Sequence, residues 1–119
     1  LDFYKKAHRI FRKTVGEESK EAAGVLQHTA VAFSQLGKHD IATDKYEEAL
    51  AIQRRLLGNQ HEEVAMTLYN IGLSKVDLGD KAGAVVCLKE AHSIYKKRGL
   101  SNGTAANTAG LLASLEGRV

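Results

Sequence analysis

Apolar residues recur along this chain at spacings of three and four positions, in runs that end at evenly placed glycines. Two of these runs are Leu26, Ala30, Phe33 and Leu36, then Ala42, Tyr46, Ala49, Ile52 and Leu56. Such spacing puts the apolar side chains on one face of an α-helix. Proline is absent, and Ala, Leu, Lys and Glu are plentiful. The pattern and the composition together predict an all-α protein.

The glycines mark where the predicted helices end. Gly16, Gly37, Gly58, Gly79 and Gly99 follow one another at spacings of 21, 21, 21 and 20 residues. Glycine adopts the left-handed conformation that ends many helices, because it has no Cβ to clash. Candidate N-caps follow these glycines: Ser19, Asp40, Asp80, and Ser101 or Asn102. We therefore predict six antiparallel helices, with turns at 16–19, 37–40, 57–61, 79–80 and 99–102.

Two consecutive helices form the repeating unit, which is 42 residues long. In one helix type, Tyr4, Ala7 and Ile10 align with Tyr46, Ala49 and Ile52, and then with Leu88, Ala91 and Ile94. In the other type, Ala23 and Leu26 align with Ala65 and Leu68, and Ala106 lies at the same distance from its preceding glycine. The small residues Ala30 and Gly72 are expected to let the paired helices approach closely. We attribute Gly24, Gly83 and Gly110, which lie inside predicted helices, to close packing as well.

The run YEEALAIQRRLLGNQHEEVAMTLYNIG, followed by LGDKAGAVVCLKEAHSIY, resembles tetratricopeptide repeats, and more narrowly the 42-residue repeats of kinesin light chains and related adaptors. The resemblance implies one domain over 1–119, a right-handed superhelical solenoid of antiparallel helix pairs. It divides the chain into a half repeat (1–16), full repeats (19–57 and 61–98) and a second half repeat (102–119). One departure is Glu62, because these families usually have proline after the linker histidine, here His61.

The resemblance also implies a site. In such solenoids the first helix of each pair lines a concave groove that binds a partner protein or linear peptide. The groove positions of the first full repeat are Gln27, His28, Val31, Ser34 and Gln35. Those of the second are Met66, Tyr69, Asn70, Leu73 and Val76, and the last helix offers Asn107, Gly110, Leu111 and Ser114. We expect a protein-interaction adaptor or scaffold.

Asn70 is the most informative of these positions. In related repeats an asparagine here often bonds the backbone of an extended peptide, since its amide both donates and accepts. The alternative is that Asn70 bonds a neighbouring helix or solvent. The family's clamp for a C-terminal carboxylate is not present, because of its usual positions only Asn70 matches. The sequence therefore predicts a groove that is polar in the first repeat and more apolar in the second.

The basic residues of the chain leave nucleic-acid binding open as a second function. The net charge is +3, and basic residues cluster in the first predicted helix and at Lys96, Lys97 and Arg98. A helical-repeat nucleic-acid-binding module could use such clusters. Against this, no aromatic residues are interleaved with them, and the helix ends at which they lie favour basic residues in any case.

No chemistry of an enzyme can be assembled from the sequence. His61-Glu62 resembles the start of a zinc-protease helix, but that motif needs a second histidine where Ala65 stands. The other histidines show no ligand spacing. We therefore expect no catalytic residues, no metal and no cofactor, and we take His61 as a linker residue. The single cysteine, Cys87, cannot form an internal disulfide, which suits a cytoplasmic protein.

The two half repeats are expected to leave apolar surface uncovered. Because the chain begins at Leu1 rather than Met, we expect it to be a piece of a longer protein. Its first helix lacks one partner and its last helix lacks the other. Candidates for self-association through these open ends are Phe3, Ile10 and Phe11, and Leu111, Leu112 and Leu115.

Overall fold

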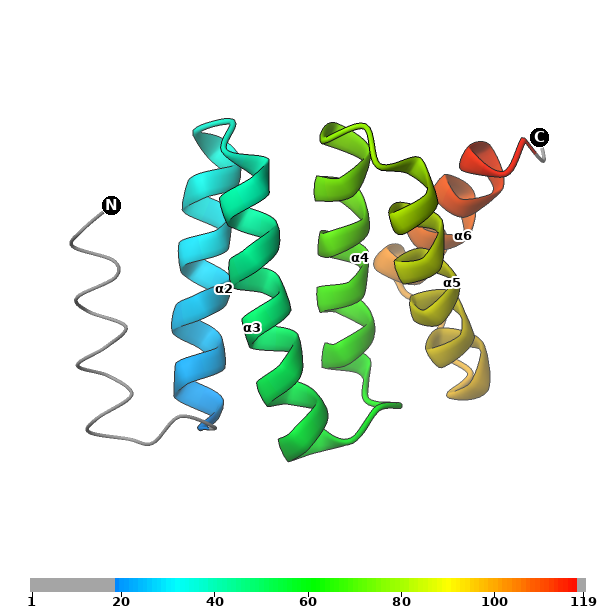
Figure 1. Ribbon diagram of the computed structural model, residues 1–119. Helices are drawn as coiled ribbons and strands as arrows, with labels where there is room; N and C mark the ends of the chain where they lie inside the picture. Colours follow the sequence, from blue (N-terminus) through cyan, green and yellow to red (C-terminus); the bar gives the residue numbers. More distant parts are fainter. Residues whose placement is uncertain (1–18, 118–119) are drawn as a thin grey trace. The chain divides into compact units, whose positions relative to one another are not determined.

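The computed structural model describes residues 19–117, and these form five α-helices without a β-strand (Figure 1). The helices are α2 (Lys20–Gln35), α3 (His39–Leu57), α4 (Glu62–Asp77), α5 (Lys81–Lys97) and α6 (Gly103–Leu115). The prediction of an all-α chain is confirmed. The first predicted helix lies outside the described residues. The chain divides into two compact units between Asn59 and Gln60.

The first unit contains the helix pair α2 and α3, which pack against each other along their lengths. Its core combines small and large side chains: Ala22, Ala23 and Leu26 from α2, and Ala49 and Ile52 from α3. Ala30 is completely buried, as expected for a position that admits a close helix neighbour. The alternation of small and large residues explains how the two helix backbones approach while their apolar side chains still fill the space between them.

The second unit contains α4, α5 and α6. Helix α5 packs against α4 and against α6, and α4 also contacts α6. At Gly72 an added Cβ would lie 2.9 Å from Leu88 Cγ, which confirms that this glycine is needed for the close approach of α4 and α5. At Gly24 and Gly110 an added Cβ would meet no atom of residues 19–117 within 4 Å. Close packing within this part of the chain therefore does not explain these two glycines, contrary to expectation.

Helix ends follow the glycines as predicted. Gly37, Gly58, Gly79 and Gly99 all have positive φ, between 66° and 84°. Ser19, Asp80 and Asn102 are N-caps whose side chains accept a hydrogen bond from the first turn. Asp40 is not: α3 begins earlier, with Lys38 at the N-cap and no side-chain cap bond. Asp40 instead lies in the first turn, where its charge still suits the helix dipole.

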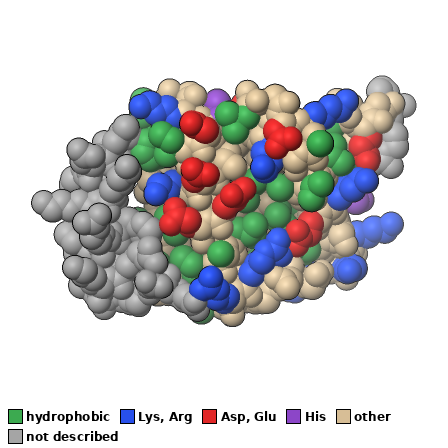
Figure 2. Space-filling view, viewed as in Figure 1, with side chains coloured by type: hydrophobic (Ala, Val, Ile, Leu, Met, Phe, Trp, Pro, Cys, Tyr) green, Lys and Arg blue, Asp and Glu red, His purple; other side chains and the backbone are tan. Residues whose placement is uncertain are grey.

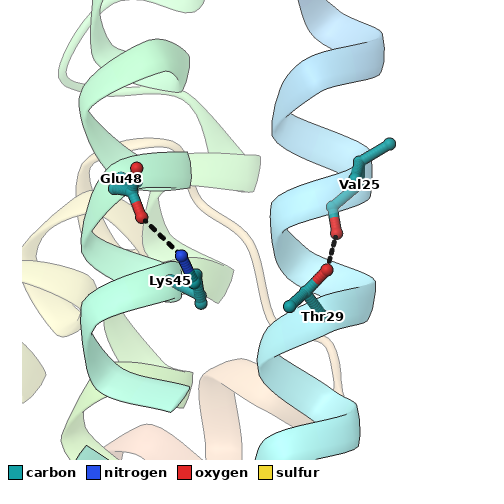
Figure 3. A network of polar contacts seen from close by, with 4 residues as sticks. All are labelled: Val25, Thr29, Lys45 and Glu48. Carbon is teal, nitrogen blue, oxygen red and sulfur yellow. Dashed lines mark hydrogen bonds and ion pairs between the residues drawn. The ribbon is translucent and has the colours of Figure 1, made fainter. Parts of the chain in front are cut away.

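Three buried threonines, Thr29, Thr43 and Thr108, bond to the backbone of their own helices. Thr29 Oγ1 donates to the carbonyl of Val25 at 2.8 Å, as Figure 3 shows beside the exposed Lys45–Glu48 ion pair of α3. Thr43 and Thr108 make the same bond to the residue four positions earlier. These bonds allow a polar residue to occupy a packed helix face without an unsatisfied hydroxyl.

No helix among the described residues is long and apolar enough to cross a membrane.

Candidate partner-binding surfaces

In the first unit, the five predicted groove residues of α2 lie away from the face that packs on α3. Gln27 and Ser34 are half-buried, whereas His28, Val31 and Gln35 are exposed, Val31 by 42%. Their spacing of one, four, seven and eight positions from Gln27 keeps them on one side of the helix. This side of α2 is mostly polar, with Val31 as its apolar residue.

In the second unit, the corresponding residues of α4 form a more apolar face. Met66 and Leu73 are 44% and 38% exposed, and Tyr69 and Asn70 between them are half-buried. The buried residues of α4, such as Ala65, Leu68 and Gly72, lie on the other side of the helix. The face formed by Met66, Tyr69, Asn70 and Leu73 is called the α4 face below.

The uncovered side of α6 adds to the α4 face. Asn107, Gly110 and Ser114 are exposed and Leu111 is half-buried, while α6 packs on α5 through Ala105, Thr108 and Leu112. Because α4 and α6 contact each other and both pack on α5, their uncovered sides belong to neighbouring helices of one unit.

Asn70 occupies the middle of the α4 face with its hydrogen-bonding groups unused. Its side-chain amide makes no hydrogen bond to any of the residues in 19–117, and it is only half-buried. The alternative that Asn70 serves to tie α4 to a neighbouring helix therefore has no support within the second unit. An asparagine amide offers two donor hydrogens and a carbonyl oxygen, enough to pair with both groups of a peptide unit.

One end of the α4 face is held by contacts between the loops. Asn102 Nδ2 donates to Glu62 Oε2 at 2.8 Å, and Arg98 Nη1 donates to the carbonyl of Gln60 at 3.1 Å. These bonds join the start of α4 to the connection between α5 and α6. They link the residues that precede and begin α4 to those that precede α6 at that end of the unit.

Tyr95 lies behind this junction and is almost fully buried, at 2% exposure. Its hydroxyl has no hydrogen-bond partner among the described residues. Burial, then the negative charge of Glu62 and the nearby Tyr69, raises the pKa of Tyr95 above its usual value of 10.0. The Tyr95 side chain therefore stays neutral at physiological pH.

His61 caps α4. Its Nδ1 accepts a hydrogen bond from the backbone N–H of Glu63 at 3.1 Å. No group of three or more His, Cys, Asp or Glu side chains in the described part of the chain is placed to hold a metal ion. His61 is thus more than a linker residue, since it supplies the acceptor that the first turn of α4 requires.

Sequence reasoning missed the bond between Glu62 and Asn102 and the cap made by His61. A signal was available for the cap: Ser19, His61 and Asn102 follow each other at about the repeat length, and each precedes a helix of the same type. Residues at the same repeat position tend to have the same task even when their side chains differ. For the Glu62–Asn102 bond the sequence carries no signal of this kind.

Comparison with known proteins agrees with this geometry. A family model described as tetratricopeptide repeat matches residues 30–97. The crystal structure of BtubC (BKLC) from P. vanneervenii is similar, with 29% identity and a TM-score of 0.81 over 98% of this chain and 48% of that chain. The chain thus spans about half the length of that protein. A search of curated proteins found no match. Because the family model covers more than half of the 119 residues, the chain belongs to the tetratricopeptide repeat family.

Proposed function

We propose that this chain is a non-enzymatic adaptor module that binds an extended segment of a partner protein on the uncovered sides of α4 and α6. Tetratricopeptide repeats are generally protein–protein interaction modules. The observation that carries the proposal is the amide of Asn70, which makes no hydrogen bond to a described residue and is set between the exposed side chains of Met66 and Leu73. A peptide laid across it would pair its backbone with Asn70 and place apolar side chains on either side.

The 42-residue spacing supports the narrower kinesin-light-chain type. Ala42, Ala49 and Ile52 are buried, and so are Ala84, Ala91 and Ile94, their counterparts one repeat later. The 42-residue repeat is therefore present in the pattern of buried residues as well as in the amino-acid sequence. A cytoplasmic location fits such an adaptor and the single free cysteine, Cys87.

The rival function is nucleic-acid binding through basic residues. Lys96 and Lys97 are exposed and make no ion pair within the described residues, so they could meet phosphates. Figure 2, however, shows Lys and Arg side chains interspersed with Asp and Glu on the face drawn. This mixture of signs favours the peptide, because nucleic-acid surfaces gather one sign of charge.

A direct binding comparison tests the proposal. Peptides selected on the purified protein from a random display library are labelled, and their affinities are measured by fluorescence anisotropy. Asn70→Ala is expected to weaken them by roughly 1–3 kcal/mol, because the peptide backbone loses its partner on binding. The double variant Lys96→Ala with Lys97→Ala is the matched control and should change little.

The same variants are then tested with a labelled single-stranded oligonucleotide over a series of salt concentrations. Binding to nucleic acid falls steeply with salt in proportion to the phosphates contacted. Affinity that depends on Lys96, Lys97 and salt, and is indifferent to Asn70, would contradict the adaptor proposal and support the rival.

A further inference from the structure

The two helices that form the proposed binding surface differ in charge from the chain as a whole, whose net charge is +3. Helix α4 carries three carboxylates, those of Glu62, Glu63 and Asp77, and one basic residue, Lys75. Helix α6 has no charged residue from Gly103 to Leu115. A ligand that lies on these two helices therefore meets a surface on which negative charge prevails.

Three of the four charges of α4 already have partners. Lys75 Nζ lies 3.6 Å from Asp80 Oδ2, and Asn102 Nδ2 donates to Glu62 Oε2 at 2.8 Å. Asp77 is not without a partner either. The remaining charge of α4 is therefore the one that is available to a ligand.

That remaining charge belongs to Glu63. Its carboxylate makes no hydrogen bond or ion pair with any residue in 19–117, although the residue is half-buried. Its backbone N–H is bonded to His61 Nδ1, which holds Glu63 in the first turn of α4. A carboxylate that has lost part of its hydration without gaining a partner benefits more from an incoming cation than a fully solvated carboxylate does.

Glu63 extends the α4 face at the start of the helix. Residues three and four apart are neighbours on a helix surface, so Met66 lies between Glu63 and Asn70. The helix rises by about 10 Å over the seven residues from Glu63 to Asn70. An extended peptide advances by about 3.3 Å per residue, and Lys and Arg have long, flexible side chains. A peptide paired with Asn70 can therefore bring such a side chain to Glu63 from a position one or two residues away.

A carboxylate in the first turn of a helix also has a structural role, because it complements the helix dipole. Glu21 of α2 has this role too, since it lies 42 residues earlier and is likewise the second residue after its N-cap. The residues beside it are of another kind, however, because the counterparts of Met66 and Asn70 in α2 are Gly24 and His28. The two glutamates thus share the dipole role and differ in the surface that adjoins them.

We propose that the partner segment is basic: it carries a lysine or arginine next to an apolar residue, and the cation of that residue pairs with Glu63. This inference rests on the proposed function, because it takes the peptide backbone to be paired with Asn70. A long basic side chain suits the site twice, since its methylene groups can pack on Met66 while its charged end reaches the carboxylate. An acidic segment would instead meet like charge.

The peptides selected on the purified protein test the inference by their sequences and by their affinities. They should be enriched in a lysine or arginine adjacent to an apolar residue. Replacing that basic residue by glutamine should weaken binding roughly 3- to 10-fold, as for an ion pair that is partly desolvated. Glu63→Gln should weaken the unchanged peptide by a similar factor. Combining the two changes should cost no more than either alone, because both remove the same contact. Fluorescence anisotropy measures all four affinities.

Glu21→Gln is the matched control. It removes the same charge from the same helix position as Glu63→Gln does, so it has the same effect on the helix dipole and on the net charge, and it should leave the affinity unchanged. Circular dichroism checks that both variants are folded to the same extent. Glu63→Arg should bind a peptide in which glutamate replaces the basic residue more tightly than it binds the unchanged peptide. A reversed preference of this kind cannot come from altered stability.

The results separate this inference from the proposed function. If Asn70→Ala weakens the selected peptides and Glu63→Gln does not, the partner segment is not read by its basic residue, and the adaptor proposal stands without it. If the affinity is indifferent to Asn70, both are wrong. Equal losses in Glu21→Gln and Glu63→Gln would overturn the inference as well, because they would reflect the net charge of the protein and not a contact at Glu63.

Discussion

Ser19, His61 and Asn102 have the same task at the starts of three helices, although their side chains differ. Each accepts a hydrogen bond from a first-turn N–H, at 3.0 Å for Ser19, 3.1 Å for His61 and 2.8 Å for Asn102. A helix leaves its first N–H groups without partners, so an acceptor is needed there whatever residue supplies it. At residue scale, the position in the repeat therefore decides that a residue caps a helix, and the side-chain type decides only how strongly it does so.

His61→Ala should lower the free energy of unfolding by about 1 kcal/mol, because the Glu63 N–H loses its acceptor. His61→Ser should restore most of the loss, since serine is a favoured N-cap. Urea unfolding followed by circular dichroism measures both. His28→Ala, at an exposed position of α2, is the control and should be neutral. Equal losses in His61→Ala and His61→Ser would show that the imidazole acts by some means other than capping.

The two buried tyrosines should make the protein sensitive to alkali. Burial raises the pKa of Tyr46, and burial together with Glu62 and Tyr69 raises the pKa of Tyr95, above 10.0. In the unfolded chain both ionise near their ordinary pKa, so folding stability is fully present below that pH and is lost as the pH rises through the folded values.

The double variant Tyr46→Phe with Tyr95→Phe should lose less stability than the unchanged protein between neutral and strongly alkaline pH. Urea unfolding at a series of pH values gives the comparison. Tyr95→Phe alone should cost little at neutral pH, because the hydroxyl it removes is buried without a partner. Parallel stability curves for the unchanged protein and the double variant would contradict the argument.

At the scale of elements, each helix has one face that a neighbouring helix covers and one face that remains uncovered. A glycine has a different effect on stability on each of these two faces. Gly72 lies on the covered face of α4, against Leu88, where no Cβ fits without a shift. Gly24 of α2 and Gly110 of α6 are helical positions at which an added Cβ would contact none of the residues that the structure describes. The same residue type is thus a packing requirement in one helix and a source of backbone entropy loss in the others.

Gly24→Ala and Gly110→Ala should each raise the free energy of unfolding by about 0.5–1 kcal/mol, because alanine reduces the entropy lost on forming the helix. Gly72→Ala should lower it, since the new methyl group would press on Leu88. Thermal and urea unfolding of the three variants check the signs. A stabilising Gly72→Ala would show that Leu88 moves aside without cost.

At the scale of the whole molecule, the last described helix, α6, leaves Ala106 exposed and Ala109 and Ala113 half-buried, whereas their counterparts in α4, Ala65, Leu68 and Gly72, are buried. A helix supplied in the same chain should therefore stabilise the protein. We expect residues 80–97 appended after Gly117 to raise the free energy of unfolding by a few kcal/mol, because they bury apolar surface on Ala106, Ala109 and Ala113 of α6. Calorimetry measures the effect. The same extension with aspartate at the position that copies Leu88 is the control, and equal stability of the two extended chains would contradict the expectation.

The helices and their ends were determined by the sequence itself. Gly37, Gly79 and Gly99 end helices because the left-handed conformation is a property of single residues, and the helical spacing of apolar residues is a property of neighbours along the chain. The 42-residue alignment also identified the close approach at Gly72, because packing in a repeat recurs with its period. The faces proposed for partner binding on α2 and α4 could be named for the same reason. That a partner binds there stays a prediction.

Only the tertiary structure decided which apolar residues remain uncovered. Leu112 was expected at the open end but is buried, at 4% exposure, because it faces α5. Ala106, whose counterparts Ala23 and Ala65 are buried, is exposed. The bond between Asn102 and Glu62 likewise depends on which side chains meet across helices, and so does the lack of a partner for the Asn70 amide within residues 19–117. Contacts between residues far apart in the chain are set by how the helices pack, and they cannot be predicted from the spacing of apolar residues along the sequence.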